Sequence, residues 1–160
     1  MNVAISIQRE RADQAEVQAL LAELDAYLAS LYAPEHNHIL DVQALLAQDV
    51  RFFVARHEGQ AVACAAVRLM PGEPATGGQA YGEVKRMYVS PSLRGQRLGV
   101  RLIDRLEATL RDEGVALALL ETGGEQHEAL RLYQRCGYAT TAPFGGYPDN
   151  GLSVFLRKVL

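Results

Sequence analysis

The sequence predicts a single domain of the α/β class. Segments with the pattern of strands and helices alternate along all 160 residues, and 49% of the residues are hydrophobic. A chain of this length can bury about two-thirds of the surface that its unfolded form exposes, so one core is sufficient. The sequence shows neither an internal repeat nor a low-complexity tract that would favour another architecture.

Five elements are predicted before residue 70. Residues 3–8 alternate between apolar and polar side chains as a strand does. Residues 12–31 carry leucines at the spacing of one helix face after an acidic first turn. Asp41 is a favourable N-cap and begins a short helix over 41–48. Strands over 50–56 and 60–69 then form a hairpin with a short turn.

The second half of the chain adds five more elements after a loop. Residues 70–79 contain two prolines and three glycines, which predicts a mobile loop. A glycine follows each of the two later helical patterns at the position where a helix ends, and an unbroken apolar run predicts a buried strand. These elements are a strand over 80–89, a helix over 97–113, a strand over 115–121, a helix over 126–136 and a strand over 152–157.

Charge and composition exclude several classes of partner. A net charge of −3 and a pI near 5.8 argue against nucleic acid and against a membrane surface. The first ten residues are too short and too polar for a secretion signal, and no apolar run approaches the roughly 20 residues of a membrane span. Cys64 and Cys136 have the surroundings of reduced thiols. We therefore expect a cytoplasmic protein.

The strongest functional signal is the loop that joins the strand ending at Val89 to the helix over 97–113. Backbone N–H groups at a helix N-terminus point outward, and the helix dipole places roughly half a positive charge there. Such a loop can bind a phosphate through its backbone. Gly95 and Gly99 are expected to let the ligand come close.

Three arginines, Arg94, Arg97 and Arg101, crowd the start of this helix, where cations are disfavoured by roughly 0.3–1 kcal/mol each. A bound polyanion would reverse that penalty, which favours a phosphate ligand. The alternative is a solvated helix face, because Arg97, Arg101 and Arg105 recur at the spacing of one face. Both interpretations stay open for Arg101 and Arg105.

Two common nucleotide-binding motifs do not fit this loop. A P-loop ends in Gly-Lys-Ser/Thr, and Leu98-Gly99-Val100 contains neither a lysine nor a hydroxyl group. A dinucleotide-binding fingerprint needs three spaced glycines after a strand, and the loop has only two.

The loop does resemble the acetyl-CoA-binding motif of the GNAT family of N-acetyltransferases, which reads Gln/Arg-x-x-Gly-x-Gly/Ala after a strand. Arg94 and Gly99 match this motif, whereas Arg97 stands where the family usually has its first glycine. Residues 129–138 resemble a second family segment, Ala-x-x-x-Tyr-x-x-x-Gly-Phe/Tyr. The spacing and order of the motifs fit the family, and the resemblance spans residues 1–160.

The resemblance implies the fold and the cofactor. The fold would be a mixed, mostly antiparallel sheet flanked by helices, in which two strands splay apart to admit acetyl-CoA. The backbone of Met87 and Val89 would pair with the pantetheine arm, and the N–H of Met87 would stabilise the oxyanion. Gln126 stands where the family often has an asparagine that contacts the cofactor. The residues expected to bind acetyl-CoA are Met87, Tyr88, Val89, Arg94, Gly95, Gln96, Arg97, Leu98, Gly99, Val100 and Gln126.

The catalytic residues that the resemblance implies are Glu83 and Tyr133. Acyl transfer needs a neutral amine, but a lysine-like amine with a pKa near 10.4 is protonated at pH 7, so the site must remove a proton directly or through water. Glu83 occupies the place of the base in family members that use a strand glutamate. Tyr133 matches the tyrosine that protonates the departing thiolate. Each also has a structural interpretation. Glu83 would be a solvent-facing strand glutamate paired with Lys85 or with a cross-strand base, and Tyr133 would be an aromatic ring packed on the sheet.

Fewer residues point to the acceptor site. Tyr32, His36 and His38 fall between the first two helices, where GNAT-like proteins often wall the acceptor pocket; the alternative is a surface loop. Lys85 and Arg86 are expected to point to opposite faces of their strand, so that only one faces the cleft. If that residue is Arg86, the acceptor carries a carboxylate. The histidines lack metal-ligand spacing, so we expect no metal.

The resemblance therefore implies an acetyl-CoA-dependent N-acetyltransferase that acts on the primary amine of a small molecule by direct attack in a ternary complex. Two alternatives stay open. One is a protein lysine or N-terminal acetyltransferase, and the other is a catalytically silent acyl-CoA-binding regulatory module. The sequence also leaves open the oligomeric state, including a homodimer.

Overall fold

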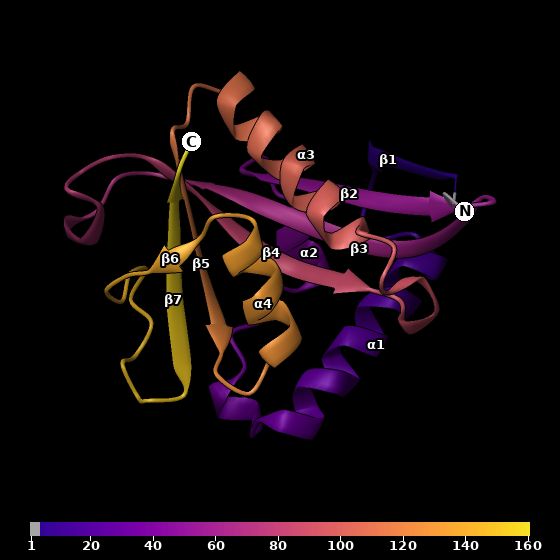
Figure 1. Cartoon of the computed structure of the whole chain (residues 1–160), viewed down its shortest axis with the longest axis horizontal. Coiled ribbons are helices and arrows are strands. Elements are labelled where there is room, and N and C mark those ends of the chain that lie inside the picture. The colour runs from indigo at the N-terminus through magenta and orange to yellow at the C-terminus, as the bar shows by residue number, and fades with distance from the viewer. Residues whose placement is uncertain (1–3) are drawn as a thin grey trace.

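The computed structural model describes residues 4–160, which form one seven-stranded sheet with helices on both faces (Figure 1). The strand order is β1-β2-β3-β4-β5-β7-β6, and every neighbouring pair is antiparallel except β4 with β5. The expected mixed, mostly antiparallel sheet is confirmed. The strands are β1 (Ile5–Arg9), β2 (Val50–His57), β3 (Gln60–Met70), β4 (Tyr81–Val89), β5 (Leu117–Gly123), β6 (Ala139–Thr140) and β7 (Ser153–Val159).

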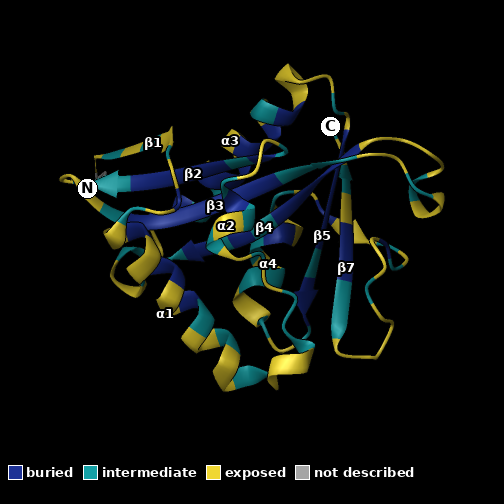
Figure 2. Cartoon of the chain, turned by 180° about the vertical axis from the view of Figure 1, so that it is seen from behind, coloured by how far each residue is buried: buried dark blue, intermediate teal, exposed yellow. Residues whose placement is uncertain are grey.

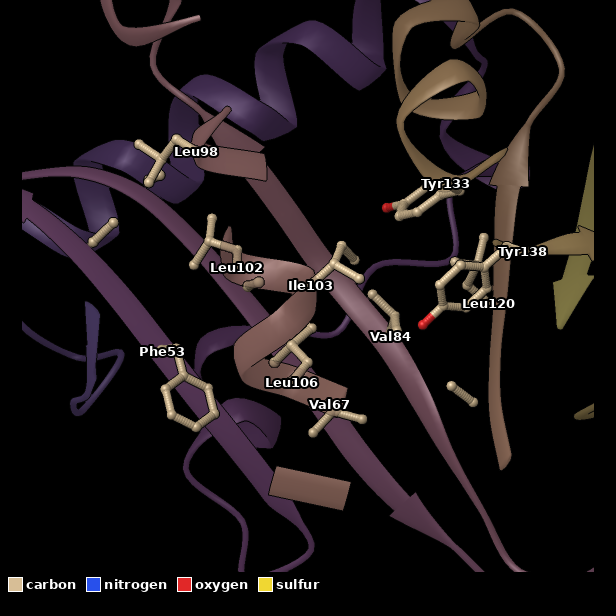
Figure 3. Close-up of a cluster of buried hydrophobic side chains, with 14 of the residues drawn as sticks. Phe53, Val67, Val84, Leu98, Leu102, Ile103, Leu106, Leu120, Tyr133 and Tyr138 are labelled. Atoms are coloured by element: carbon tan, nitrogen blue, oxygen red, sulfur yellow. The ribbon is translucent and has the colours of Figure 1, made fainter. Parts of the chain in front are cut away.

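The helices cover the two faces of the sheet and enclose a hydrophobic core on each. They are α1 (Ala15–Leu31), α2 (Val42–Leu45), α3 (Leu98–Asp112) and α4 (His127–Arg135). Successive residues of β2 alternate between the cores, since Phe53 packs under α3 and Phe52 packs under α1. Figure 3 shows the core under α3, and Figure 2 shows the strands buried between helices whose outer faces are exposed. No helix within residues 4–160 has the length and apolarity needed to cross a membrane.

The sheet opens between β4 and β5. These two strands pair only at Gly82–Ala118 and Glu83–Leu119. Beyond these positions β4 continues alongside β3, while β5 pairs with β7 along its whole length (Figure 1). The outer backbone edge of β4 beyond Glu83 therefore has no strand partner within residues 4–160, and a ligand can lie along it.

Three details differ from the sequence prediction. β6 was not predicted, because two exposed residues are too few to show an alternating pattern. The short helix at Asp41 ends at Leu45 rather than near residue 48. The loop expected to be mobile is held by Glu73, whose carboxylate accepts hydrogen bonds from the Tyr81 hydroxyl at 2.6 Å and from the backbone N–H of Gly145 at 2.8 Å. The first residue of the first predicted strand, at position 3, lies outside the described residues.

Candidate active site

A cavity of about 900 Å³ lies along the end of β4 that does not pair with β5. Its walls are the end of β4, the loop that follows, the first turn of α3 and one side of α4, and α1 closes it at Leu24 and Tyr27. All of the residues expected to bind acetyl-CoA line it except Gln96. Its volume lies within the roughly 300–1,000 Å³ of ligand-binding pockets. We call it the cofactor cleft.

The first turn of α3 contributes its N-terminus to the cofactor cleft. The N-cap residue is Arg97, whose side chain makes no capping hydrogen bond. Arg97 has a left-handed backbone, with φ 59° and ψ 23°, which glycine adopts far more readily than other residues. The backbone shape of the usual motif glycine is therefore kept here by an arginine. A helix N-terminus of this kind is suited to bind a pyrophosphate.

The arginines near this loop divide into two groups. Arg94 lines the cofactor cleft, where its Nε donates to the carbonyl of Val89 at 3.1 Å and its guanidinium lies 5.8 Å from the centre of the Tyr88 ring. Arg101 instead donates to a backbone carbonyl of β1 at 3.1 Å, and Arg105 lies over an aromatic ring of β2 at 5.4 Å. For Arg101 and Arg105 the structure favours a structural role.

Two arginines that the sequence analysis did not single out, Arg131 and Arg135, line the cofactor cleft from α4. They lie four residues apart and so share one helix face, a spacing that could have revealed them. The cleft wall then carries four arginines against the two carboxylates of Asp104 and Glu128. This excess of positive charge suits a ligand with several phosphates.

Gly99 lines the cofactor cleft and also has a packing role that was not expected. A Cβ added to Gly99 would lie 2.9 Å from a methyl group of Leu132, and it would not point into open space. The missing side chain therefore lets α3 pack closely against α4. Gly95 has φ 80° and nothing lies within 4 Å of an added Cβ, so its role beside a ligand stays a prediction.

A second, smaller cavity of about 100 Å³ adjoins the cofactor cleft. The two cavities share Leu24, Met87 and Gln126 in their walls. We call the smaller one the side cavity. All four residues that the sequence analysis assigned to the acceptor site, Tyr32, His36, His38 and Arg86, line it. Met87 stands at the junction, next to both a cofactor in the cleft and a small molecule in the side cavity.

Tyr32 closes one end of the side cavity. Its hydroxyl accepts a hydrogen bond from the backbone N–H of Glu125 at 3.1 Å. A Cβ on Gly123, the last residue of β5, would lie only 1.8 Å from this hydroxyl oxygen. Gly123 is thus needed for the ring of Tyr32 to pack against the end of β5.

A β-bulge in β4 places both Lys85 and Arg86 in the wall of the side cavity. Arg86 and Met87 lie opposite the single residue Ala65 of β3, and Arg86 has φ 58°. The expectation that only one of Lys85 and Arg86 faces the cleft is therefore wrong, because it assumed regular alternation along the strand. The nearly buried Arg86 side chain donates from Nη1 to Asp25 of α1 at 2.5 Å.

Glu83 is buried, with 4% of its surface exposed, and it does not line either cavity. Its carboxylate accepts a hydrogen bond from the hydroxyl of Tyr147 and lies 3.7 Å from Lys85 Nζ. Lys85 in turn donates to the Tyr147 hydroxyl at 2.8 Å and to the carbonyl of His38 at 3.0 Å. Glu83 does lie beside Lys85, but the alternative of a solvent-facing Glu83 is wrong because the side chain is buried. Tyr147 and Lys85 link the buried carboxylate to the side cavity.

Beside the side cavity, the sequence analysis missed Tyr147 and Glu121. Tyr147 lies in the irregular segment before β7, where no periodic pattern indicates which side chain turns inward. Burial, together with the negative charges of Glu83 and Glu121, raises the pKa of the Tyr147 hydroxyl. Glu121 lines the side cavity from β5 and accepts a hydrogen bond from Ser153 at 2.7 Å. No sequence signal brings these distant segments together.

Tyr133 lies in the wall of the side cavity and also in the core under α3 (Figure 3). Its ring packs edge-on against Tyr138 with centroids 6.0 Å apart. Burial raises the pKa of the Tyr133 hydroxyl, so the group stays protonated at neutral pH. A protonated phenol can donate a proton, which is what the departing thiolate requires.

The cysteines are both free thiols. Burial raises the pKa of Cys64 to about 12 and also raises the pKa of Cys136, which lines the cofactor cleft. Because the thiolate is the nucleophilic form, neither residue has an activated thiol. In the part of the chain that the structure describes, no group of three or more His, Cys, Asp or Glu side chains is arranged to hold a metal ion.

The divided sheet, the helix N-terminus at its opening and the two sequence motifs define one class of enzyme. Residues 17–138 match the acetyltransferase (GNAT) family, and the chain belongs to that family. It is an N-acetyltransferase whose acetyl donor is acetyl-CoA.

Known relatives cover nearly the whole chain. The chain is 44% identical over 156 residues to the IAA acetyltransferase of Azospirillum brasilense, across 98% of both sequences. A crystal structure from Klebsiella pneumoniae, of a protein classed as an acyl-CoA N-acyltransferase, superposes with a TM-score of 0.81 at 37% identity over 99% of both chains. A GNAT acetyltransferase from Elizabethkingia anophelis with acetyl-CoA bound gives a TM-score of 0.64 at 16% identity over 98% of both chains, which concerns the fold alone.

Proposed function

We propose that the enzyme acetylates the primary amine of a small molecule, which binds in the side cavity. The observation that carries this proposal is the junction of the two cavities at Met87, because an amine in the side cavity there faces a thioester in the cofactor cleft. A cavity of about 100 Å³ suits a small acceptor better than the surface of a folded protein. The similarity to an IAA acetyltransferase is consistent with a small acceptor.

Transfer proceeds directly, within a ternary complex. The amine nitrogen attacks the thioester carbonyl carbon, so that a C–N bond forms and the C–S bond breaks. We assign stabilisation of the oxyanion to the backbone N–H of Met87, on the edge of β4 that lies beyond its pairing with β5. The raised pKa values of Cys64 and Cys136 argue against a covalent acyl-enzyme on either thiol.

We assign the removal of the amine proton to Glu83, acting through Tyr147 and Lys85. The hydrogen bonds run in one direction, from the Lys85 ammonium to the Tyr147 hydroxyl and from that hydroxyl to the Glu83 carboxylate. Tyr147 passes its proton to Glu83 and takes one from the Lys85 ammonium, and the neutral Lys85 amine that results then accepts the proton of the acceptor amine. Lys85 and Tyr147 end as they began, and Glu83 holds the proton.

The proton that the leaving thiolate takes up comes from Tyr133 in this proposal. Tyr133 lies in the wall of the side cavity, and its buried hydroxyl is protonated at neutral pH. Proton transfer from Tyr133 converts the CoA thiolate into a thiol and so prevents the reverse attack. Solvent then returns the proton to Tyr133.

We further propose that the enzyme works in the cytoplasm, with acetyl-CoA and an amine as its only ligands and without nucleic acid or a membrane. The net charge of −3 and the pI near 5.8 support this. A homodimer stays an untested prediction.

The test incubates the purified protein and acetyl-CoA with amines, amino acids and aminoglycosides. Release of the CoA thiol is measured for each compound. A lysine-containing peptide and an unfolded protein serve as a second arm. We expect at least one small amine to release thiol and to yield the N-acetyl product. Acetylation of the second arm alone would contradict the small-molecule proposal, and binding of acetyl-CoA without thiol release from any amine would indicate a silent module.

A further inference from the structure

We propose that the acceptor carries a carboxylate close to its amine, and that the Arg86 guanidinium binds this carboxylate in the side cavity. The inference rests on the proposed function and adds the chemical class of the acceptor, which is an amino acid or a closely related aminocarboxylate.

The first observation is the unfilled hydrogen-bonding capacity of Arg86. Its side chain is 5% exposed and lines the side cavity. Asp25 accepts from Nη1 at 2.5 Å, but the buried Nε has no hydrogen-bond partner in residues 4–160. A buried charged donor without a partner is costly, and a guanidinium presents paired N–H groups that match a carboxylate. An anion in the side cavity is the ligand that this geometry fits.

The second observation concerns His38. His38 lines the side cavity, and its Nε2 is also buried without a hydrogen-bond partner among the described residues. Two unpartnered nitrogens thus belong to one small cavity. A protonated Nε2 can donate to a carboxylate, so His38 supplies a second contact.

The other charged residues of the cavity wall agree with an acceptor that carries one positive and one negative group. Lys85 is already engaged by Tyr147 and by the His38 carbonyl, which leaves Arg86 as the cation available to a ligand. Glu121 is the carboxylate in the wall, and Ser153 donates to it. An ammonium group can bind near Glu121 while the carboxylate binds Arg86.

The position of Arg86 limits the distance between the two groups of the acceptor. Arg86 is adjacent in sequence to Met87, at the junction where the acetyl group is transferred. Both residues line the side cavity, whose volume is only about 100 Å³, so one small molecule can reach both of them. The carboxylate therefore lies only a few bonds from the reacting amine, as in an α- or β-amino acid.

The test compares free L-amino acids with their carboxamides as acceptors for the wild-type enzyme. The amide removes only the negative charge, and its less basic amine is the more reactive one at neutral pH. We expect kcat/KM for the best acid to exceed that for its amide by at least tenfold. We also expect butyrate, which has no amine, to inhibit competitively against the acceptor, whereas butyramide does not.

Variants then locate the carboxylate site. Arg86→Gln is expected to raise KM for the acid by tenfold or more with little change in kcat, in KM for the amide or in acetyl-CoA affinity, and Arg86→Lys should recover part of the loss. Asp25→Asn, which alters the partner of Arg86 outside the cavity wall, should keep the preference for acids. Circular dichroism checks that each variant is folded, and the butyrate experiment needs no variant.

Equal use of acids and amides, or an equal loss for both in Arg86→Gln, would overturn the assignment. Acetylation confined to uncharged amines or aminoglycosides would refute the carboxylate proposal and leave the proposed function standing. If no small amine of any kind released thiol, both proposals would fail.

Discussion

At the scale of single residues, the central feature is a directed pair of hydrogen bonds. Glu83 is too deeply buried to touch an acceptor, yet Lys85 and Tyr147 connect its carboxylate to the side cavity. Lys85 is the member of this chain that lines the cavity. In the proposed mechanism, these hydrogen bonds let Glu83 act as the base without contacting the acceptor.

Removing the carboxylate charge of Glu83 tests this path of hydrogen bonds. Glu83→Gln is expected to lower turnover at neutral pH by roughly 10²–10⁴-fold, the range for loss of general-base catalysis. The loss should shrink as pH rises, because more of the amine is then neutral without help. A pH–rate profile under saturating acetyl-CoA measures both effects, and near-normal turnover at pH 7 would leave Glu83 as a structural residue.

Tyr147→Phe breaks the same path of hydrogen bonds at its middle residue. It keeps the ring that packs against Phe144 and Phe155 and removes the hydroxyl that links Lys85 to Glu83. We expect the same pH-dependent loss as in Glu83→Gln and no further loss when the two changes are combined, because both break one path. Additive losses would show that the residues act separately.

Tyr133→Phe separates the acid role of Tyr133 from its role in the core. If its hydroxyl protonates the thiolate, turnover should fall by about a hundredfold or more. The unfolding free energy should change by at most about 1 kcal/mol, because the ring remains. A thioester with a more acidic leaving thiol should recover part of the activity. Full activity with the natural thioester would remove Tyr133 from the mechanism.

At the scale of elements, the start of α3 combines strain with function. Arg97 holds the left-handed conformation that the loop requires, although a Cβ makes it unfavourable by about 1–2 kcal/mol. Arg97 therefore adds a cation to the wall of the cofactor cleft and lowers the stability of the loop.

Two substitutions at this position isolate the backbone effect, because both remove the arginine charge. Arg97→Gly is expected to be more stable than Arg97→Ala by about 1 kcal/mol, since glycine adopts a positive φ without a steric cost. Urea unfolding of the two variants measures the difference. An alanine variant that is as stable as the glycine variant would show that the loop is not strained.

Much of the fold was predictable at this scale, because α3 and the central strands carry long periodic patterns. The cofactor loop was predictable for a related reason, since its glycine, its arginines and the following helix are contiguous in sequence. The bulge at Arg86 and the position of Tyr147 were not predictable. A bulge depends on the register with the neighbouring strand, and Tyr147 reaches Glu83 from a segment 64 residues away.

At the scale of the whole molecule, the function depends on how the sheet divides. β4 and β5 pair at only two positions, so the strands separate, the side cavity lies between them and the cofactor cleft lies along the end of β4. α1 and α3 cover opposite faces of the sheet, and both reach the opening. The cofactor cleft therefore combines the N-terminal end of a helix on one face with residues of a helix on the other.

The most direct test is the affinity for acetyl-CoA of two variants at Val100, in the first turn of α3 and in the wall of the cofactor cleft. Val100→Glu introduces a negative charge beside the expected pyrophosphate, and Val100→Gln introduces a neutral side chain of the same shape. A glutamate near a helix N-terminus does not destabilise the helix, so both variants should fold. Titration calorimetry should show at least tenfold weaker binding by Val100→Glu than by Val100→Gln. Equal affinities in two folded variants would contradict the placement of the phosphates at α3.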